Sequence, residues 1–250
     1  MLFEKLNEVE HLTGIFGIIS TCTAFLLGII VLYKAIDTKQ KLLFLFFLTV
    51  TCTASPWYPS GLGYIYLLIT GNTFDYRFYI LLGTVLIPIA IHAWLTIYMT
   101  IIFPKKKNLV LILYGVIAII FYIYLFYFLY LAPGAPIENM IGIKRTIIDI
   151  DYKGFVLVYL LILIITTIIT GIHFSLISMR TDSIVVKWKG KFLLAAFISF
   201  GIGAFIDGLL ELSIITLIIC RLIILFSTLF FYIGFIMPKW MKKIIDLSKA

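Results

Sequence analysis

The sequence predicts an all-α fold, a bundle of seven transmembrane helices with its N-terminus outside the cell and its C-terminus in the cytoplasm. Three observations predict it: an apolar composition, seven long apolar runs and an uneven distribution of basic residues. Of 250 residues, 63% are hydrophobic and 13% charged, and the mean hydropathy is +1.15, far from the usage of soluble domains. The chain is therefore expected to be a multi-pass protein of the cell membrane, and a soluble nucleic-acid-binding protein is excluded despite the net charge of +8.

Each of the seven apolar runs is long enough to cross a bilayer, which takes about 20 helical residues at a rise of about 1.5 Å per residue. They cover approximately residues 13–33, 42–69, 79–103, 109–131, 155–179, 192–212 and 215–237. Residues 1–237 therefore form a seven-helix domain, and residues 238–250 form a short cytoplasmic tail. The short loops leave no room for a catalytic domain outside the membrane.

Basic residues set the orientation, because Lys and Arg in short loops are retained on the cytoplasmic side of the membrane. The gaps after the first, third, fifth and seventh runs share one face and contain fourteen of the 20 basic residues. The opposite face contains five, and Arg221 lies inside a run. This asymmetry places the N-terminus outside.

The second run is interrupted by the segment 55–61, Ser-Pro-Trp-Tyr-Pro-Ser-Gly. Pro56 and Pro59 remove amide donors and clash with the preceding helical turn, which predicts a kink or an unwound turn. Two interpretations stay open: Trp57 lines the wall of a ligand pocket, or Trp57 and Tyr58 only fill a structural kink. Pro88 predicts a weaker break in the third run.

The longest connection, residues 132–154, lies on the outer face. Its segment from Met140 to Tyr152 is rich in Ile with polar residues at alternating positions, a pattern that favours a β-hairpin. Such a hairpin either forms a lid over the outer mouth of the bundle or lies in the headgroup region.

Ionisable residues inside the runs are the strongest functional pointers, since each costs about 2.5–3.5 kcal/mol at the bilayer centre. Asp207 and Glu211 lie one turn apart in the sixth run, and Arg221 lies in the seventh. Because Asp207 and Arg221 are equally distant from the turn between the runs, we expect them to form an ion pair. The pair is either a structural salt bridge or part of a ligand-binding switch, and Glu211 is either solvated or a second acceptor for Arg221.

His92 in the third run and His173 in the fifth lack a second histidine one helical turn away. Each is therefore interpreted as a hydrogen-bonded packing residue or, alternatively, as a proton sensor. Catalytic motifs of the GxSxG, HExxH and P-loop types are absent from the sequence. We expect no enzyme activity, no metal site and no cofactor, and the last run contains no lysine that could bind retinal.

The tail after Met237 alternates apolar and basic residues, which predicts a short amphipathic helix directly continuous with the seventh run. Its basic residues and its tryptophan suit the inner surface of the membrane; they are Lys239, Trp240, Lys242 and Lys243. The tail is either a membrane anchor or a docking helix for a partner protein.

Two segments carry a resemblance to a known family: the sequence from Gly201 through Asp207 and Arg221 to Trp240, and the stretch 146–159. They resemble the seven-transmembrane sensor region at the N-terminus of prokaryotic histidine kinases and its stand-alone archaeal relatives. The resemblance implies a ligand sensor whose last helix transmits to a cytoplasmic output. The sequence departs from the kinase form because only thirteen residues follow Met237, with no phospho-accepting histidine or ATP-binding domain.

These observations predict a receptor-like sensory protein that binds a small, largely apolar ligand in the outer half of the bundle and signals to a separate cytoplasmic or membrane protein. The candidate ligand-binding or switch residues are Trp57, His92, Asp207, Glu211 and Arg221. The expected partners are the lipid bilayer, the ligand and the signalling protein, with no nucleic acid. A transporter or lipid-handling carrier and a structural subunit of a membrane complex are the alternatives.

Overall fold

A computed structural model of the chain describes residues 6–132, 134–209 and 213–245. The chain divides into two compact units. The first unit contains Met1–Leu163 and Leu212–Leu217, and the second contains Ile164–Glu211 and Ile218–Ala250. Each unit is considered separately below.

The described residues contain seven helical segments that are long and apolar enough to cross a membrane, here called spans 1 to 7. In chain order they are Glu8–Thr38, Lys41–Thr70, Tyr76–Ile102, Pro104–Leu131, Gly154–Met179, Ile184–Gly208 and Ile214–Ile236. The prediction of seven helices long and apolar enough to cross a membrane is therefore confirmed, with most boundaries within a few residues of those expected.

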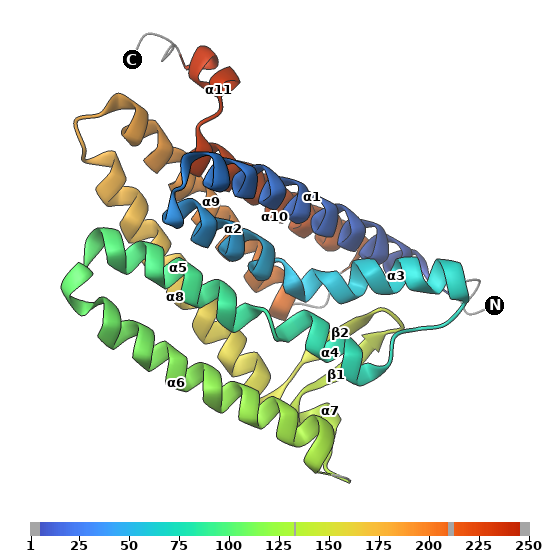
Figure 1. Cartoon of the computed structure of the whole chain (residues 1–250). Helices are drawn as coiled ribbons and strands as arrows, with labels where there is room; N and C mark the ends of the chain where they lie inside the picture. Colours follow the sequence, from blue (N-terminus) through green and yellow to red (C-terminus); the bar gives the residue numbers. More distant parts are fainter. Residues whose placement is uncertain (1–5, 133, 210–212, 246–250) are drawn as a thin grey trace. The chain divides into compact units, whose positions relative to one another are not determined.

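The first unit contains spans 1 to 4, a hairpin and the first turns of span 5. Its long helices pack as neighbours, with α1 against α2 and α3, α2 against α5, and α5 against α6 (Figure 1). In chain order its elements are α1 (Glu8–Thr38), α2 (Lys41–Thr53), the 3₁₀ turn η2 (Ser55–Trp57), α3 (Tyr58–Thr70), α4 (Tyr76–Thr84), α5 (Ile87–Ile102), the 3₁₀ turn η3 (Pro104–Lys106), α6 (Lys107–Phe126), the π-helical turn η4 (Tyr127–Leu131), α7 (Ile137–Met140), β1 (Gly142–Thr146), β2 (Asp149–Tyr152) and the start of α8 (Gly154–Met179).

Spans 2 and 3 are both broken, as the prolines predict. Span 2 changes from α-helix to a 3₁₀ turn at Ser55, and span 3 is interrupted between Thr84 and Ile87. Hydroxyl groups of neighbouring helices satisfy two carbonyls at the break in span 3: Ser55 Oγ donates to Gly83 O over 3.2 Å, and Tyr122 Oη donates to Val85 O over 2.7 Å. These hydrogen bonds take the place of helical bonds at the break. They are needed because lipid offers no donor to a buried carbonyl.

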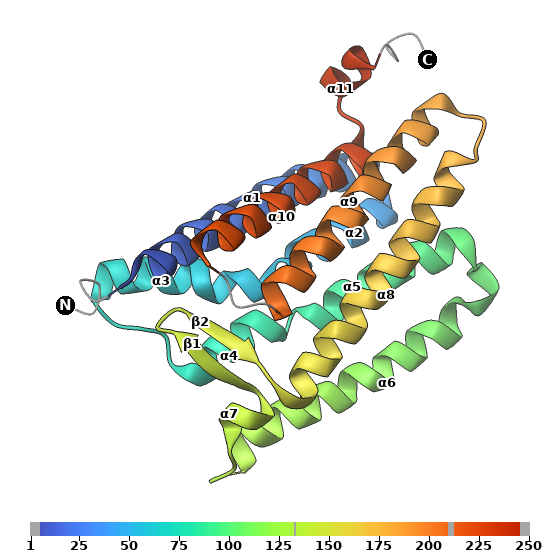
Figure 2. The same ribbon diagram turned by 180° about the vertical axis from the view of Figure 1, so that it is seen from behind.

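The predicted hairpin is present as an antiparallel pair of β1 and β2 (Figure 2). Gly142 pairs with Tyr152, and the register shifts between Lys144 and Thr146. Arg145 forms ion pairs with Asp149, at 3.7 Å, and with Asp151, on the opposite strand. Alternation of apolar and polar residues in a short segment was therefore a correct signal for strands.

The second unit contains the remainder of α8, followed by α9 (Ile184–Leu209), most of α10 (Ile214–Ile236) and α11 (Lys239–Ile244). Small residues allow close packing here, because added side-chain carbons would collide with neighbouring helices. A Cβ at Gly171 would lie 2.2 Å from the ring of Phe197, and one at Gly203 would lie 2.6 Å from Ile224.

Helix α9 begins at Ile184, whereas the sequence predicted a start near residue 192, after three lysines. Two of those lysines lie on the helix with long side chains that reach a polar or an aromatic partner while the backbone stays helical. Lys189 Nζ donates to Phe235 O over 3.0 Å, and Lys191 Nζ lies 4.2 Å from the centre of a Trp188 ring. Charge alone was therefore a poor marker of the helix start.

The expectation that the tail continues the seventh helix directly is wrong. Helix α10 ends at Ile236, and Met237 adopts a left-handed conformation with φ of 48°. Pro238 follows with extended backbone, and α11 begins only at Lys239. Proline has no amide hydrogen to continue the helical bonding, so the junction is a turn.

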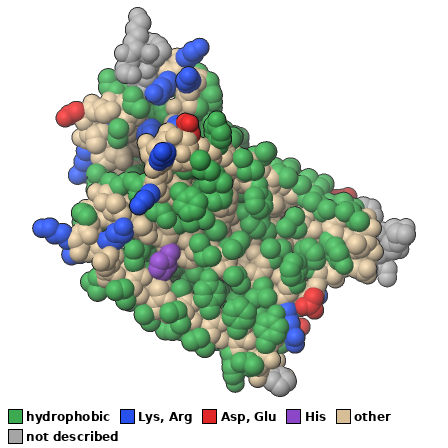
Figure 3. Space-filling view, viewed as in Figure 1, with side chains coloured by type: hydrophobic (Ala, Val, Ile, Leu, Met, Phe, Trp, Pro, Cys, Tyr) green, Lys and Arg blue, Asp and Glu red, His purple; other side chains and the backbone are tan. Residues whose placement is uncertain are grey.

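The exposed face of α6 is apolar from Leu109 onward, as a lipid-facing surface requires. Hydrophobic side chains line the lower edge of the view, where α6 runs, and basic side chains gather at the turn between α5 and α6 (Figure 3). The exposed residues of this face are Leu109, Ile112, Leu113, Val116, Ile119, Ile120 and Ile123.

The direct contact between the backbones of α1 and α3 predicts a packing-sensitive position. A Cβ at Gly17 would lie 2.6 Å from the backbone nitrogen of Gly61, whereas one at Gly115 would meet only His92, at 3.7 Å. Gly17→Ala should lower the free energy of unfolding by about 1–3 kcal/mol, because the helices must separate. Reversible unfolding in mixed detergent micelles measures this effect.

Gly115→Ala is the matched control, because both substitutions gain helix propensity of up to about 1 kcal/mol. It should leave stability unchanged or raise it. Equal effects of the two substitutions would contradict the close contact of α1 and α3.

Candidate functional site

The hairpin is held at one end of the first unit by tyrosines from α4. Tyr76 Oη donates to Gly142 O over 2.7 Å, and Tyr79 Oη donates to Ile148 O over 3.0 Å. A third tyrosine, from α6, acts on the segment before the hairpin: Tyr124 Oη donates to the carbonyl of Met140 over 3.0 Å. Each bond joins a helix to the backbone of the connection, so the hairpin position is linked to the positions of both helices.

Glu10 connects the start of α1 to the turn of the hairpin. One carboxylate oxygen accepts from Asn7 N at 2.8 Å, which completes the N-terminal cap of α1. The other accepts from Ile147 N at 3.2 Å. The side chain is buried, and its carboxylate lies at the positive end of the helix dipole. The pattern Asn-x-x-Glu at 7–10 signals the cap, but no sequence signal reveals the contact with Ile147.

Below the hairpin, buried hydroxyls from α3 and α4 form a short chain of hydrogen bonds. Ser60 Oγ and Tyr79 Oη lie 2.9 Å apart, and Tyr79 bonds the hairpin as described above. Tyr79 therefore joins α3, α4 and the hairpin through a single oxygen. Sequence reasoning missed it, because a tyrosine in an apolar run gives no sign of which polar group it reaches.

Tyr152, the last residue of β2, points its hydroxyl into this region. Its Oη is buried and forms no hydrogen bond with any described residue. A Cβ at Gly83 would lie 2.5 Å from this oxygen and 3.2 Å from Pro59. Burial, followed by the negative charge of Asp149, raises the pKa of Tyr152 above its usual value, so the hydroxyl stays protonated and acts as a donor.

Trp57 lies in η2 with 8% of its surface exposed, inside the first unit. Its neighbour Tyr58 donates to Thr51 O and stacks on Phe25, with ring centres 5.2 Å apart. Tyr58 and Phe25 thus pack beside the break in span 2. The role of Trp57 as a pocket wall stays a prediction.

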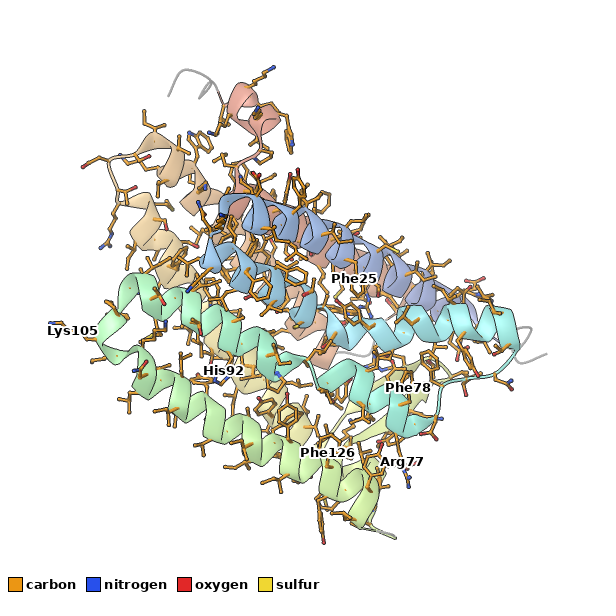
Figure 4. The ribbon with its side chains drawn as sticks, in the orientation of Figure 1. Phe25, Arg77, Phe78, His92, Lys105 and Phe126 are labelled. Carbon is orange, nitrogen blue, oxygen red and sulfur yellow. The ribbon has the colours of Figure 1, made fainter. Side chains whose placement is uncertain are left out.

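His92 lies on α5 (Figure 4). In this view it lies between Lys105, at one end of the first unit, and Arg77, at the other end. Its Nε2 lies 3.0 Å from Leu111 O, on α6. This bond ties α5 to α6 at a half-buried position and agrees with a packing role. Near the hairpin end, the Arg77 guanidinium lies 5.2 Å from the centre of the Tyr130 ring.

The predicted ion pair in the second unit is confirmed. Arg221 Nη2, on α10, lies 3.0 Å from Asp207 Oδ1, on α9, and the two side chains are 3% and 16% exposed. Beside the pair, Cys220 Sγ donates to Gly203 O over 3.1 Å, which packs the same two helices. Glu211, the proposed second acceptor, lies outside the described residues.

The three lysines and the tryptophan predicted for the membrane surface lie together on α11. None of the residues of this helix is buried, and Trp240 is 46% exposed. They are Lys239, Trp240, Lys242 and Lys243.

A metal-binding group is not found in the described part of the chain, where no three His, Cys, Asp or Glu side chains lie close enough to hold an ion. The hairpin end of the first unit offers hydroxyls, a carboxylate and aromatic rings instead. This arrangement suits binding of a molecule by hydrogen bonds and apolar contact.

Removing either partner of the ion pair should destabilise the protein. Asp207→Asn and Arg221→Leu should each lower the free energy of unfolding by about 3–5 kcal/mol, because each removes an opposite charge 3.0 Å from a charged side chain that is shielded from solvent. The double variant should recover part of the combined loss. Thermal unfolding in detergent completes this double-mutant cycle, and strict additivity would argue against direct interaction.

No family model, no curated protein and no solved structure matches the chain. The resemblance to the sensor region of histidine kinases therefore stays a prediction. The functional argument has to come from the contacts of the chain itself.

Proposed function

We propose that the chain is a receptor-like sensory protein of the cell membrane that binds a small, largely apolar ligand beneath the hairpin and signals to a separate protein through α11. The observation that carries this proposal is the attachment of the hairpin to α1 and α4 by Glu10, Tyr76 and Tyr79. A ligand that displaces the hairpin changes hydrogen bonds on both helices at once. Such differential contact is what a ligand needs to shift a two-state equilibrium.

A covalent path leads from the hairpin to the second unit. Strand β2 ends at Tyr152, and α8 begins at Gly154 and continues into the second unit. Within the first unit, the start of α8 is fixed by stacking of Tyr159 on Phe121, with ring centres 4.1 Å apart. Displacement of the hairpin therefore acts directly on the first turns of α8.

The orientation that suits this function places the hairpin outside the cell. The distribution of fourteen against five basic residues supports it. The lysines of α11 then lie at the cytoplasmic surface, where anionic lipids attract basic segments. A cytoplasmic or membrane signalling protein is the proposed recipient of the signal, as the resemblance to the kinase sensor region implies.

One observation favours the alternative, a transporter or carrier. Spans 2 and 3 are both discontinuous and meet at their breaks, where Ser55 bonds Gly83 O. Transporters build substrate sites from discontinuous helices whose free backbone groups face a cavity. Flux of a molecule across proteoliposomes containing the protein would establish that function.

The orientation predicts which positions react with an impermeant maleimide. In a variant without Cys22, Cys52 and Cys220, cysteines introduced at Thr73 and Asn139 should be labelled from outside intact cells. Cysteines at Asn108 and Ser183 should be labelled only after permeabilisation. The reverse pattern would place the hairpin in the cytoplasm and reject the receptor proposal.

Signalling predicts that α11 responds to a ligand. A nitroxide label on a cysteine at Ile244, which is 70% exposed, should change its spectrum when an apolar extract of host membranes is added to the protein in nanodiscs. A label at Leu109, 71% exposed on α6, is the control for direct effects of the extract on lipid order. Equal responses at both positions, or none, would contradict the receptor function.

A further inference from the structure

We propose that the Tyr152 hydroxyl is the hydrogen-bond donor of a small-molecule site between the hairpin and the breaks of spans 2 and 3. The ligand is a neutral molecule with an acceptor oxygen, such as a ketone, ester or ether, on an otherwise apolar body. This inference rests on the proposed function for the place where the ligand enters. It adds the atom that recognises the ligand and the chemical class of the ligand.

The Tyr152 hydroxyl differs from three other buried hydroxyls near the breaks, each of which has a hydrogen-bond partner. Ser55 Oγ donates to Gly83 O, Thr84 Oγ1 donates to Ile80 O, and Ser60 Oγ pairs with Tyr79 Oη. The Tyr152 Oη is equally buried, yet no described residue accepts its proton. A buried donor without an acceptor destabilises the protein, and a ligand that supplies an acceptor removes this penalty on binding.

The fold gives the Tyr152 hydroxyl its place. Gly83 lies where any larger residue would meet this oxygen, because its Cβ would be 2.5 Å away. Glycine at the end of α4 therefore lets the phenol reach the level of the break in span 3. The same Cβ would lie 3.2 Å from Pro59, so the ring of a proline at the start of α3 borders the region.

The surroundings define the ligand. Pro59 has no amide hydrogen and Gly83 no side chain, so neither offers a side-chain polar group to a ligand and both suit an apolar body. The carbonyl of Gly83 is already engaged by Ser55. An anion is disfavoured because Asp149, whose charge acts on Tyr152, and Asp151 together outnumber their shared partner Arg145. A ligand with an ammonium group has no acceptor there for the phenol proton. The remaining class of ligand is a neutral molecule with an acceptor oxygen.

The test compares two probes of similar shape, cyclohexanone and methylenecyclohexane, which differ by one acceptor oxygen. Each is titrated into the purified full chain while the thermal unfolding midpoint is recorded. Cyclohexanone should bind the natural protein with a Kd about three- to tenfold lower than that for Tyr152→Phe, the effect of about one hydrogen bond. Methylenecyclohexane should bind both proteins equally.

Two variants serve as controls. Thr21 on α1 also has a buried hydroxyl without a hydrogen-bond partner among the described residues, so Thr21→Val removes such a group from a different helix and should leave both probe affinities unchanged. Tyr79→Phe removes two hydrogen bonds and should lower the unfolding midpoint without any probe. This second variant shows that the assay detects loss of a satisfied phenol.

The proposal is overturned if Tyr152→Phe leaves the affinity for cyclohexanone unchanged, or if cyclohexanone does not stabilise the natural protein. A lower midpoint of Tyr152→Phe without saturable probe binding means that the hydroxyl holds a water molecule only, and also overturns it. The spin-label experiment separates this site from the receptor function. Probe binding without movement at Ile244 rejects signalling alone, whereas movement that persists in Tyr152→Phe rejects this site alone.

Discussion

The requirement that every buried carbonyl find a donor governs the first unit, because lipid offers none. Span 3 is interrupted between Thr84 and Ile87, and neighbouring segments supply hydroxyls to carbonyls at this break. Ser55 and Tyr122 donate to the backbone around the end of α4. The break in span 3 is therefore held by η2 and α6, which cannot move away from it without leaving these carbonyls unsatisfied.

The hairpin extends this arrangement beyond the helices. A two-stranded hairpin is marginally stable by itself in water, and here it is stabilised by side chains that arise from α1 and α4. Glu10 and Tyr79 each form one bond within the helical part and one to the hairpin. Loss of the hairpin contacts would thus also weaken the cap of α1 and the pairing of α3 with α4.

Elements whose signals are local could be predicted from the sequence. Seven apolar runs, the breaks at Pro56 and Pro88, the hairpin and the pairing of Asp207 with Arg221 all follow from composition, proline chemistry or distance from a turn. Contacts between distant segments could not. Tyr152 is one of 15 tyrosines, and only the fold places its hydroxyl beside Gly83. The start of α9 was misjudged because lysines that reach a carbonyl or a ring remain helical.

The turn at Met237 and Pro238 limits what α10 can communicate to α11. A continuous helix transmits rotation about its axis, but a left-handed residue followed by an extended proline uncouples the azimuth of one helix from that of the next. Lys189 donates to Phe235 O and so ties the end of α10 to α9, and the two-residue junction is short enough for a shift of α10 along its axis to move the start of α11. An output protein bound to α11 would therefore sense its height relative to the membrane surface and not its angular phase.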